Sequence, residues 1–172
     1  MNSLIETFWN VCRFRLGPQD LPASQALFIG TLLLYVLMST IISGFEMAPE
    51  RALLSAIVEV ALMLGMTRMM LWVRDLWPRF QQTSTALLGT GILFGFVAVP
   101  LMWWQSQYEK PMDAFVPSLL IFILFVWSVA VTGHILRHAL NTPFYVGVLL
   151  SLLYTYVSIT ILRAIFVTST GS

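Results

Sequence analysis

Glu59 is the residue whose type and position most directly suggest chemistry. It lies about seven residues inside an apolar stretch long enough to cross a bilayer, or roughly 10 Å from the nearer end of a helix. An ionised carboxylate at that depth costs several kcal/mol unless it is paired, hydrated or protonated. It is therefore either a proton or cation site or a structural group. We favour the structural interpretation, with Arg163 as the ion-pair partner of Glu59, because no second membrane carboxylate is present to form a relay.

A second group consists of His134, Arg137 and His138, whose spacing places them on one face of a helix. Two imidazoles could supply a pair of metal ligands. The other side chains with ligand atoms expected at the same end are Cys12, Asp20 and Asp75. However, no CxxC or HExxH spacing is present, and a helix C-terminus at a cytoplasmic surface favours basic residues through the helix dipole and anionic headgroups. We predict anchoring or lipid contact here, with no metal, no cofactor and no catalytic residue.

Five apolar stretches must position these side chains. Of the 172 residues, 58% are hydrophobic and 10% are charged, and the mean hydropathy is +0.84. A spanning helix needs roughly 20 mostly apolar residues. The predicted spans are Ser24–Phe45, Ala52–Trp72, Thr83–Trp104, Phe115–Leu136 and Pro143–Phe166. We predict an all-α polytopic membrane protein with an N-terminal segment (1–23), one transmembrane domain (24–166) and a short tail (167–172).

The N-terminal segment, up to Gly17-Pro18, mixes polar and apolar residues at helical spacing. Leu4, Phe8 and Trp9 fall on its apolar face, and Asp20 is predicted to cap the first span. The pattern indicates a short amphipathic helix that lies on the inner membrane surface. The other placement, in which the helix packs against its own bundle, remains open.

Small residues predict which helix faces pack together. Gly91 and Gly95 form a GxxxG pair, and Gly147, Ser151 and Thr155 form a stripe on the fifth span. In lipid, helix association depends on close backbone approach, which such residues allow. We interpret both patterns as packing inside one chain, and no further feature supports a homo-oligomer.

The basic residues predict the orientation. The six on one side are Arg13, Arg15, Arg68, Arg74, Arg79 and Arg137, and the three on the other are Arg51, Lys110 and Arg163. Because Lys and Arg in short loops are retained in the cytoplasm, we expect the N-terminus inside and the C-terminus outside.

A family resemblance follows from three segments and the span order. The segments are Gly17-Pro18-Gln19-Asp20-Leu21-Pro22, Gln82-Thr83-Ser84-Thr85-Ala86-Leu87 and Gly133-His134-Ile135-Leu136-Arg137-His138. With a short N-terminal region and five closely spaced spans, the chain resembles the Yip1-like membrane proteins, including small proteobacterial inner-membrane proteins. The resemblance implies a non-enzymatic membrane organiser or accessory protein in the bacterial inner membrane. The family's Asp-Leu-Tyr-Gly-Pro motif is absent, so no site residue is carried over.

The leading hypothesis is a non-catalytic inner-membrane protein that acts as an accessory, scaffold or membrane-organising factor. Its expected partners are membrane lipids or another membrane protein, and a net charge of +1 gives no reason to expect nucleic acid. The first alternative is a small secondary transporter or proton-coupled permease centred on Glu59. The second is a metal-handling protein or membrane enzyme that uses His134 and His138.

Overall fold

The computed structural model describes residues 4–108 and 114–166, and its secondary structure in these ranges is helical. Five helices are long and apolar enough to cross a membrane, which confirms the predicted all-α membrane class. They are α2 (Gln25–Ser43), α3 (Pro49–Val73), α4 (Phe80–Ser106), α5 (Phe115–Leu140) and α6 (Phe144–Phe166), and a short helix α1 (Leu4–Cys12) precedes them. Single 3-10 turns, η1 (Pro18–Asp20) and η2 (Trp77–Arg79), lie before α2 and α4.

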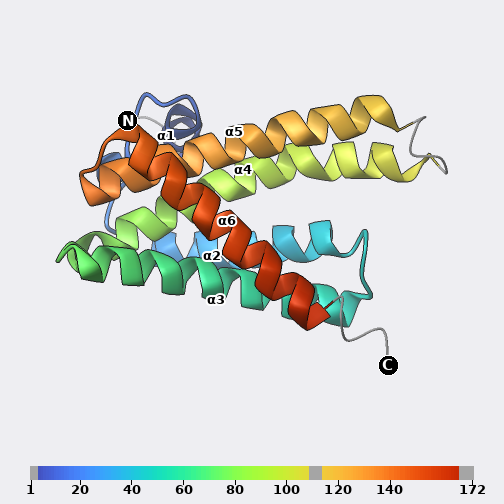
Figure 1. Cartoon of the computed structure of the whole chain (residues 1–172), viewed down its shortest axis with the longest axis horizontal. Helices are drawn as coiled ribbons and strands as arrows, with labels where there is room; N and C mark the ends of the chain where they lie inside the picture. Colours follow the sequence, from blue (N-terminus) through green and yellow to red (C-terminus); the bar gives the residue numbers. More distant parts are fainter. Residues whose placement is uncertain (1–3, 109–113, 167–172) are drawn as a thin grey trace.

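The spans form two antiparallel pairs that a fifth helix crosses. Helices α2 and α3 pack together, as do α4 and α5, and α2 also contacts α4. Helix α6 packs against α5 and α3, and Figure 1 shows it crossing the bundle diagonally. At the end of the bundle opposite α1, the α4–α5 pair separates from the α2–α3 pair. The result is a bundle that is closed at the α1 end and splayed at the other.

Helix α5 runs four residues beyond its predicted end at Leu136. It stops where Asn141 adopts a left-handed conformation with φ 52°, and the Asn141 and Thr142 amides donate to the carbonyl of Arg137. The last carbonyls of α5 also accept hydrogen bonds from two arginines. Arg74 donates to the Leu140 carbonyl at 3.4 Å and Arg79 to the Ala139 carbonyl at 3.3 Å. These cations lie where the helix dipole favours positive charge.

The N-terminal helix is shorter than the pattern predicts. It ends at Cys12 rather than at Gly17-Pro18, because Phe14 adopts a left-handed conformation with φ 61° and the Arg15 amide donates to the Asn10 carbonyl at 2.9 Å. This backbone arrangement satisfies carbonyls at the helix end and redirects the chain before the proline is reached.

Asp20 does not cap the first span, contrary to the sequence-based prediction. Its Oδ2 accepts a hydrogen bond from the Gly17 amide at 2.8 Å, which closes the turn η1. The cap of α2 is Ser24, whose hydroxyl accepts from the Leu27 amide at 3.4 Å. The reason is distance along the chain, since four residues, Leu21 to Ser24, separate Asp20 from the first residue of α2, Gln25.

The GxxxG pair of α4 faces α2. A Cβ on Gly91 would lie 2.4 Å from the ring of Tyr35, and one on Gly95 would lie 3.2 Å from Met38. The pair therefore serves packing within the chain, where a larger residue would push α2 away.

The stripe on α6 faces α5. A Cβ on Gly147 would lie 2.3 Å from the backbone oxygen of Gly133, a glycine that the sequence pattern did not single out for packing. Ser151 donates to the Val129 carbonyl at 2.8 Å, whereas Thr155 bonds within its own helix. Close approach and one interhelical hydrogen bond thus hold the α5–α6 contact.

Candidate functional site

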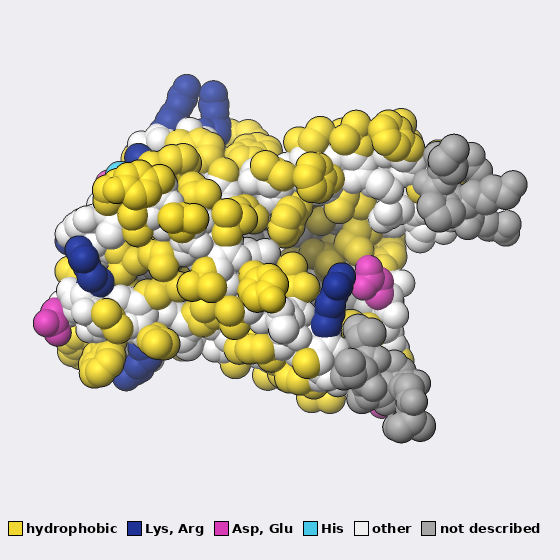
Figure 2. Space-filling model, viewed as in Figure 1, with side chains coloured by type: hydrophobic (Ala, Val, Ile, Leu, Met, Phe, Trp, Pro, Cys, Tyr) yellow, Lys and Arg dark blue, Asp and Glu magenta, His cyan; other side chains and the backbone are white. Residues whose placement is uncertain are grey.

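A cleft of about 410 Å³ lies between the two helix pairs, and all five spans contribute to its walls. In Figure 2 it is visible as a recess between α5 and α6. Most lining residues are apolar, among them Phe94 and Ala98 of α4, Phe125 of α5 and Leu162 of α6. Its volume falls within the range of about 300–1,000 Å³ that is usual for small-molecule sites.

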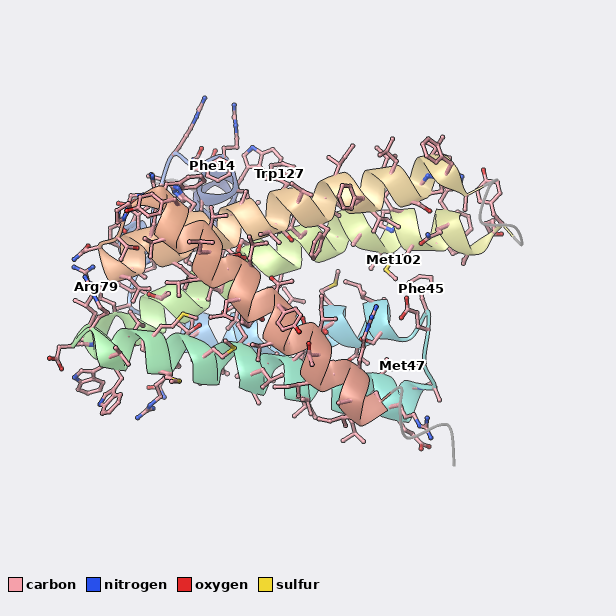
Figure 3. All side chains as sticks on the ribbon, viewed as in Figure 1. Phe14, Phe45, Met47, Arg79, Met102 and Trp127 are labelled. Carbon is pink, nitrogen blue, oxygen red and sulfur yellow. The ribbon has the colours of Figure 1, made fainter. Side chains whose placement is uncertain are left out.

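Met102 marks the splayed end of this cleft. It lines the wall contributed by α4, and Figure 3 shows it across the opening from the α2–α3 connection, where Phe45 and Met47 lie. A separate void of about 10 Å³ lies toward the α1 end, and Met66 and Met70 help to line it. The cleft itself is open at the splayed end of the bundle.

Glu59 lines this cleft. Tyr35 donates its hydroxyl to Oε1 of Glu59 at 2.8 Å, and the hydroxyl of Ser39 donates to Oε2. Both donors come from α2, one turn apart. Each carboxylate oxygen of Glu59 therefore has one hydroxyl partner from α2.

Arg163 is not the partner of Glu59, which corrects the pairing predicted from the sequence. Its side chain is exposed near the end of α6, and the described part of the chain has no ion pair between the two residues. An exposed guanidinium near a helix end keeps its hydration, which a move inward would remove.

Ser158 is a further polar group in the cleft wall. Its side chain is 6% exposed, and its hydroxyl interacts with that of Tyr154, one turn earlier on α6. Two further hydroxyls of the wall bond to their own helix, Thr90 to the Ala86 carbonyl and Ser128 to the Phe125 carbonyl. Glu59, whose two oxygens each accept one hydrogen bond, keeps acceptor capacity for a ligand.

The two partners of Glu59 were not predicted, although their spacing in the sequence indicates them. Tyr35 and Ser39 lie four residues apart in an otherwise apolar helix, which puts two hydroxyls on one face. Only the pairing of α2 with α3 identifies the carboxylate as their target.

His134 is buried rather than on the inner face, where the basic cluster was predicted. Only 2% of it is exposed, and its Nε2 lies 3.0 Å from the carbonyl oxygen of Leu16. Since a carbonyl only accepts, Nε2 carries the proton in this contact. The Phe14 ring packs edge-on at 5.2 Å. His134 therefore attaches the N-terminal segment to α5.

His138 and Arg137 interact with each other. Arg137 lies 3.2 Å from Nε2 of His138 and 5.4 Å above the ring of Phe144. Because a guanidinium only donates, Nε2 of His138 is the acceptor. Residues 4–108 and 114–166 contain no group of three His, Cys, Asp or Glu side chains that could hold a metal ion.

The helix α1 docks against α4 and α5. Phe8 and Cys12 are buried at 7% and 2% exposure, and the Trp127 indole donates to the Cys12 carbonyl at 3.1 Å. Leu4 and Trp9 stay exposed at 47% each. Figure 3 labels Phe14 and Trp127 on the side of the bundle where α1 lies. Burial raises the pKa of the Cys12 thiol from its ordinary 9.0 to about 12.

The chain matches no protein-family model, no curated protein and no solved structure.

Proposed function

We propose that this chain is a non-catalytic integral membrane protein that acts by binding a lipid-like molecule, with an alkyl chain, in the cleft between its two helix pairs. The observation that supports this proposal is the cleft itself. Its walls are mainly apolar, it lies within the spans, and the recess in Figure 2 faces sideways between α5 and α6. An alkyl chain in the surrounding bilayer could enter by that side without crossing water. An accessory or membrane-organising role, as the Yip1-like resemblance implies, agrees with such binding.

A substitution that fills the cleft with a larger side chain tests this proposal. Ala98 lines it, whereas the adjacent Val97 is 47% exposed on the outer surface of the same helix. Ala98→Phe should reduce photolabelling of the cleft by a diazirine-bearing fatty alcohol about tenfold, because an added ring in a filled space costs about 1–3 kcal/mol. Mass spectrometry of the labelled peptides, with purified protein in nanodiscs, measures the change.

Val97→Phe is the matched control and should leave the labelling pattern unchanged, because its ring extends into lipid. Equal labelling of the cleft in both variants would contradict the proposal. So would a wild-type protein that is labelled on its outer helix faces and nowhere in the cleft.

The proposed orientation keeps the N-terminus in the cytoplasm of a bacterial cell, with the inner membrane as the location. It is supported by the arginines of the α1 end, including Arg74 and Arg79. A reporter that is active only in the periplasm should work when fused after Ser172 and fail when fused at Phe80. The opposite pattern would reverse the orientation.

A proton-coupled permease is the second candidate function. The observation that favours it is a second, small void toward the α1 end, which shares Met63 and Tyr154 with the cleft lining and is also lined by Met66 and Met70. Methionine side chains are flexible, so a shift of their rotamers would extend the opening along the bundle. Glu59 would then lie on a path between the two membrane faces.

A further inference from the structure

We propose that the ligand of the cleft is a lipophilic amine, whose ammonium group binds the carboxylate of Glu59 while its alkyl chain occupies the apolar walls. This inference rests on the proposed function, since it names the class of molecule that the cleft takes.

The first argument is the charge balance of the cleft. Of the residues that line it, Glu59 is the one with a formal charge, and the other titratable groups are Tyr35 of α2 and Tyr154 of α6. The walls from α4 and α5 contribute no Asp, Glu, His, Lys or Arg to the lining. The carboxylate therefore has hydroxyl donors but no counter-cation in the described chain. A ligand cation would supply the missing charge and lower the cost of the ionised form inside the membrane.

The second argument is the remaining hydrogen-bonding capacity. A carboxylate has about four acceptor sites, and two are used by Tyr35 and Ser39. The Ser158 hydroxyl lies in the same wall and interacts with Tyr154, and its oxygen has a further lone pair that can accept. An ammonium group carries several N–H donors and no acceptor, so its needs match these groups. Tyr154 and Phe94 also line the cleft, and aromatic rings of this kind attract cations through their faces.

The third argument concerns the source of the amine. Glu59 follows the first residue of α3, Pro49, by ten residues, which corresponds to about 15 Å along the helix axis. The amine of a phospholipid headgroup lies at the membrane surface and does not reach that depth without pulling its glycerol backbone into the hydrocarbon. A single-chain amine meets no such obstacle. The depth of the carboxylate therefore favours a free lipophilic amine.

The experiment compares two probes of equal chain length on the full-length protein in nanodiscs. Dodecylammonium is positively charged at neutral pH and carries three N–H donors, and dodecanol is neutral. The wild type should bind the ammonium at least about tenfold more tightly than the alcohol. Glu59→Gln should bring the two affinities together while dodecanol binding is retained, which also shows that the variant is folded. Glu50→Gln, an exposed change in the first turn of the same helix, should keep the preference.

The outcomes separate the two proposals. If neither probe binds the wild type, the proposed function fails. If both bind with equal affinity and Glu59→Gln changes neither, the cleft binds lipid-like molecules but the amine assignment is overturned. If phosphatidylethanolamine in the nanodisc competes in proportion to its content, the ammonium comes from a headgroup and the free amine is excluded.

Discussion

Gly147→Leu should unfold the α5–α6 contact and lower the thermal midpoint of the detergent-purified protein by roughly 10 °C. The physical reason is that a Cβ at this position would lie 2.3 Å from the backbone oxygen of Gly133 and 2.9 Å from the Cβ of Arg137. Backbone atoms of a helix cannot rotate aside as a side chain does, so α6 must move as a whole. Overpacking lowers the free energy of unfolding by about 1–3 kcal/mol where side chains can relax. A loss of about 3 kcal/mol lowers the thermal midpoint of a chain of this size by about 6–12 °C.

Gly30→Leu is the matched control for this change. No atom lies within 4 Å of a Cβ added at Gly30, which faces outward on α2. A leucine there would contact lipid, and the thermal midpoint should stay within a few degrees of wild type. Thermal melts followed by circular dichroism and by size-exclusion recovery give both values. A Gly147→Leu protein as stable as Gly30→Leu would mean that the two helices do not approach as closely as described.

The five spans were predictable because their signal is local. Each consists of about 20 or more residues of uniform apolarity, and the bilayer allows only a helix for such a stretch. Span ends were less predictable, as α5 shows. Its apolar run weakens at Arg137, but the helix continues until Asn141 can adopt a left-handed backbone. The ends depend on single capping residues rather than on hydropathy.

The surroundings of Glu59 were only partly predictable. The sequence shows that a carboxylate lies inside a span, and it indicates that small residues bring helices together. It cannot show that hydroxyls of α2 bind this carboxylate, because that depends on which helices pack as neighbours. Arg163 was chosen as partner from charge alone, whereas the structure supplies two neutral hydroxyls, those of Tyr35 and Ser39.

The contact between the basic cluster and the N-terminal segment could not be predicted from the sequence either. The spacing of His134, Arg137 and His138 defines one helix face correctly, but the sequence does not reveal what covers that face. The chain from Phe14 to Leu16 returns over α5 and buries His134. Likewise, the amphipathic pattern of α1 did not separate its buried edge at Phe8 and Cys12 from its exposed edge at Leu4.

Gly89→Leu should release α1 and make Cys12 reactive toward maleimide. Gly89 lies on α4 under the Phe8 ring, and an added Cβ would lie 2.1 Å from that ring. Because Phe8 is only 7% exposed, its ring has little room to move while α1 stays docked. In the wild type, Cys12 is 2% exposed and its thiol pKa is about 12 instead of 9.0, which lowers the thiolate fraction about a thousandfold at neutral pH.

Labelling at about pH 7.5 should therefore be slow for the native wild type and complete after unfolding in dodecyl sulfate. Gly89→Leu should raise the native rate at least about tenfold, since undocking restores both the access of the reagent and the ordinary pKa of the thiol. Gly65→Leu is the control, because no atom lies within 4 Å of a Cβ at that position of α3. Rapid labelling of the native wild type would show that α1 lies on the membrane surface, away from α4. An unreactive Gly89→Leu protein would show that Phe8 can move aside while Trp127 still holds the Cys12 carbonyl and keeps the helix in place.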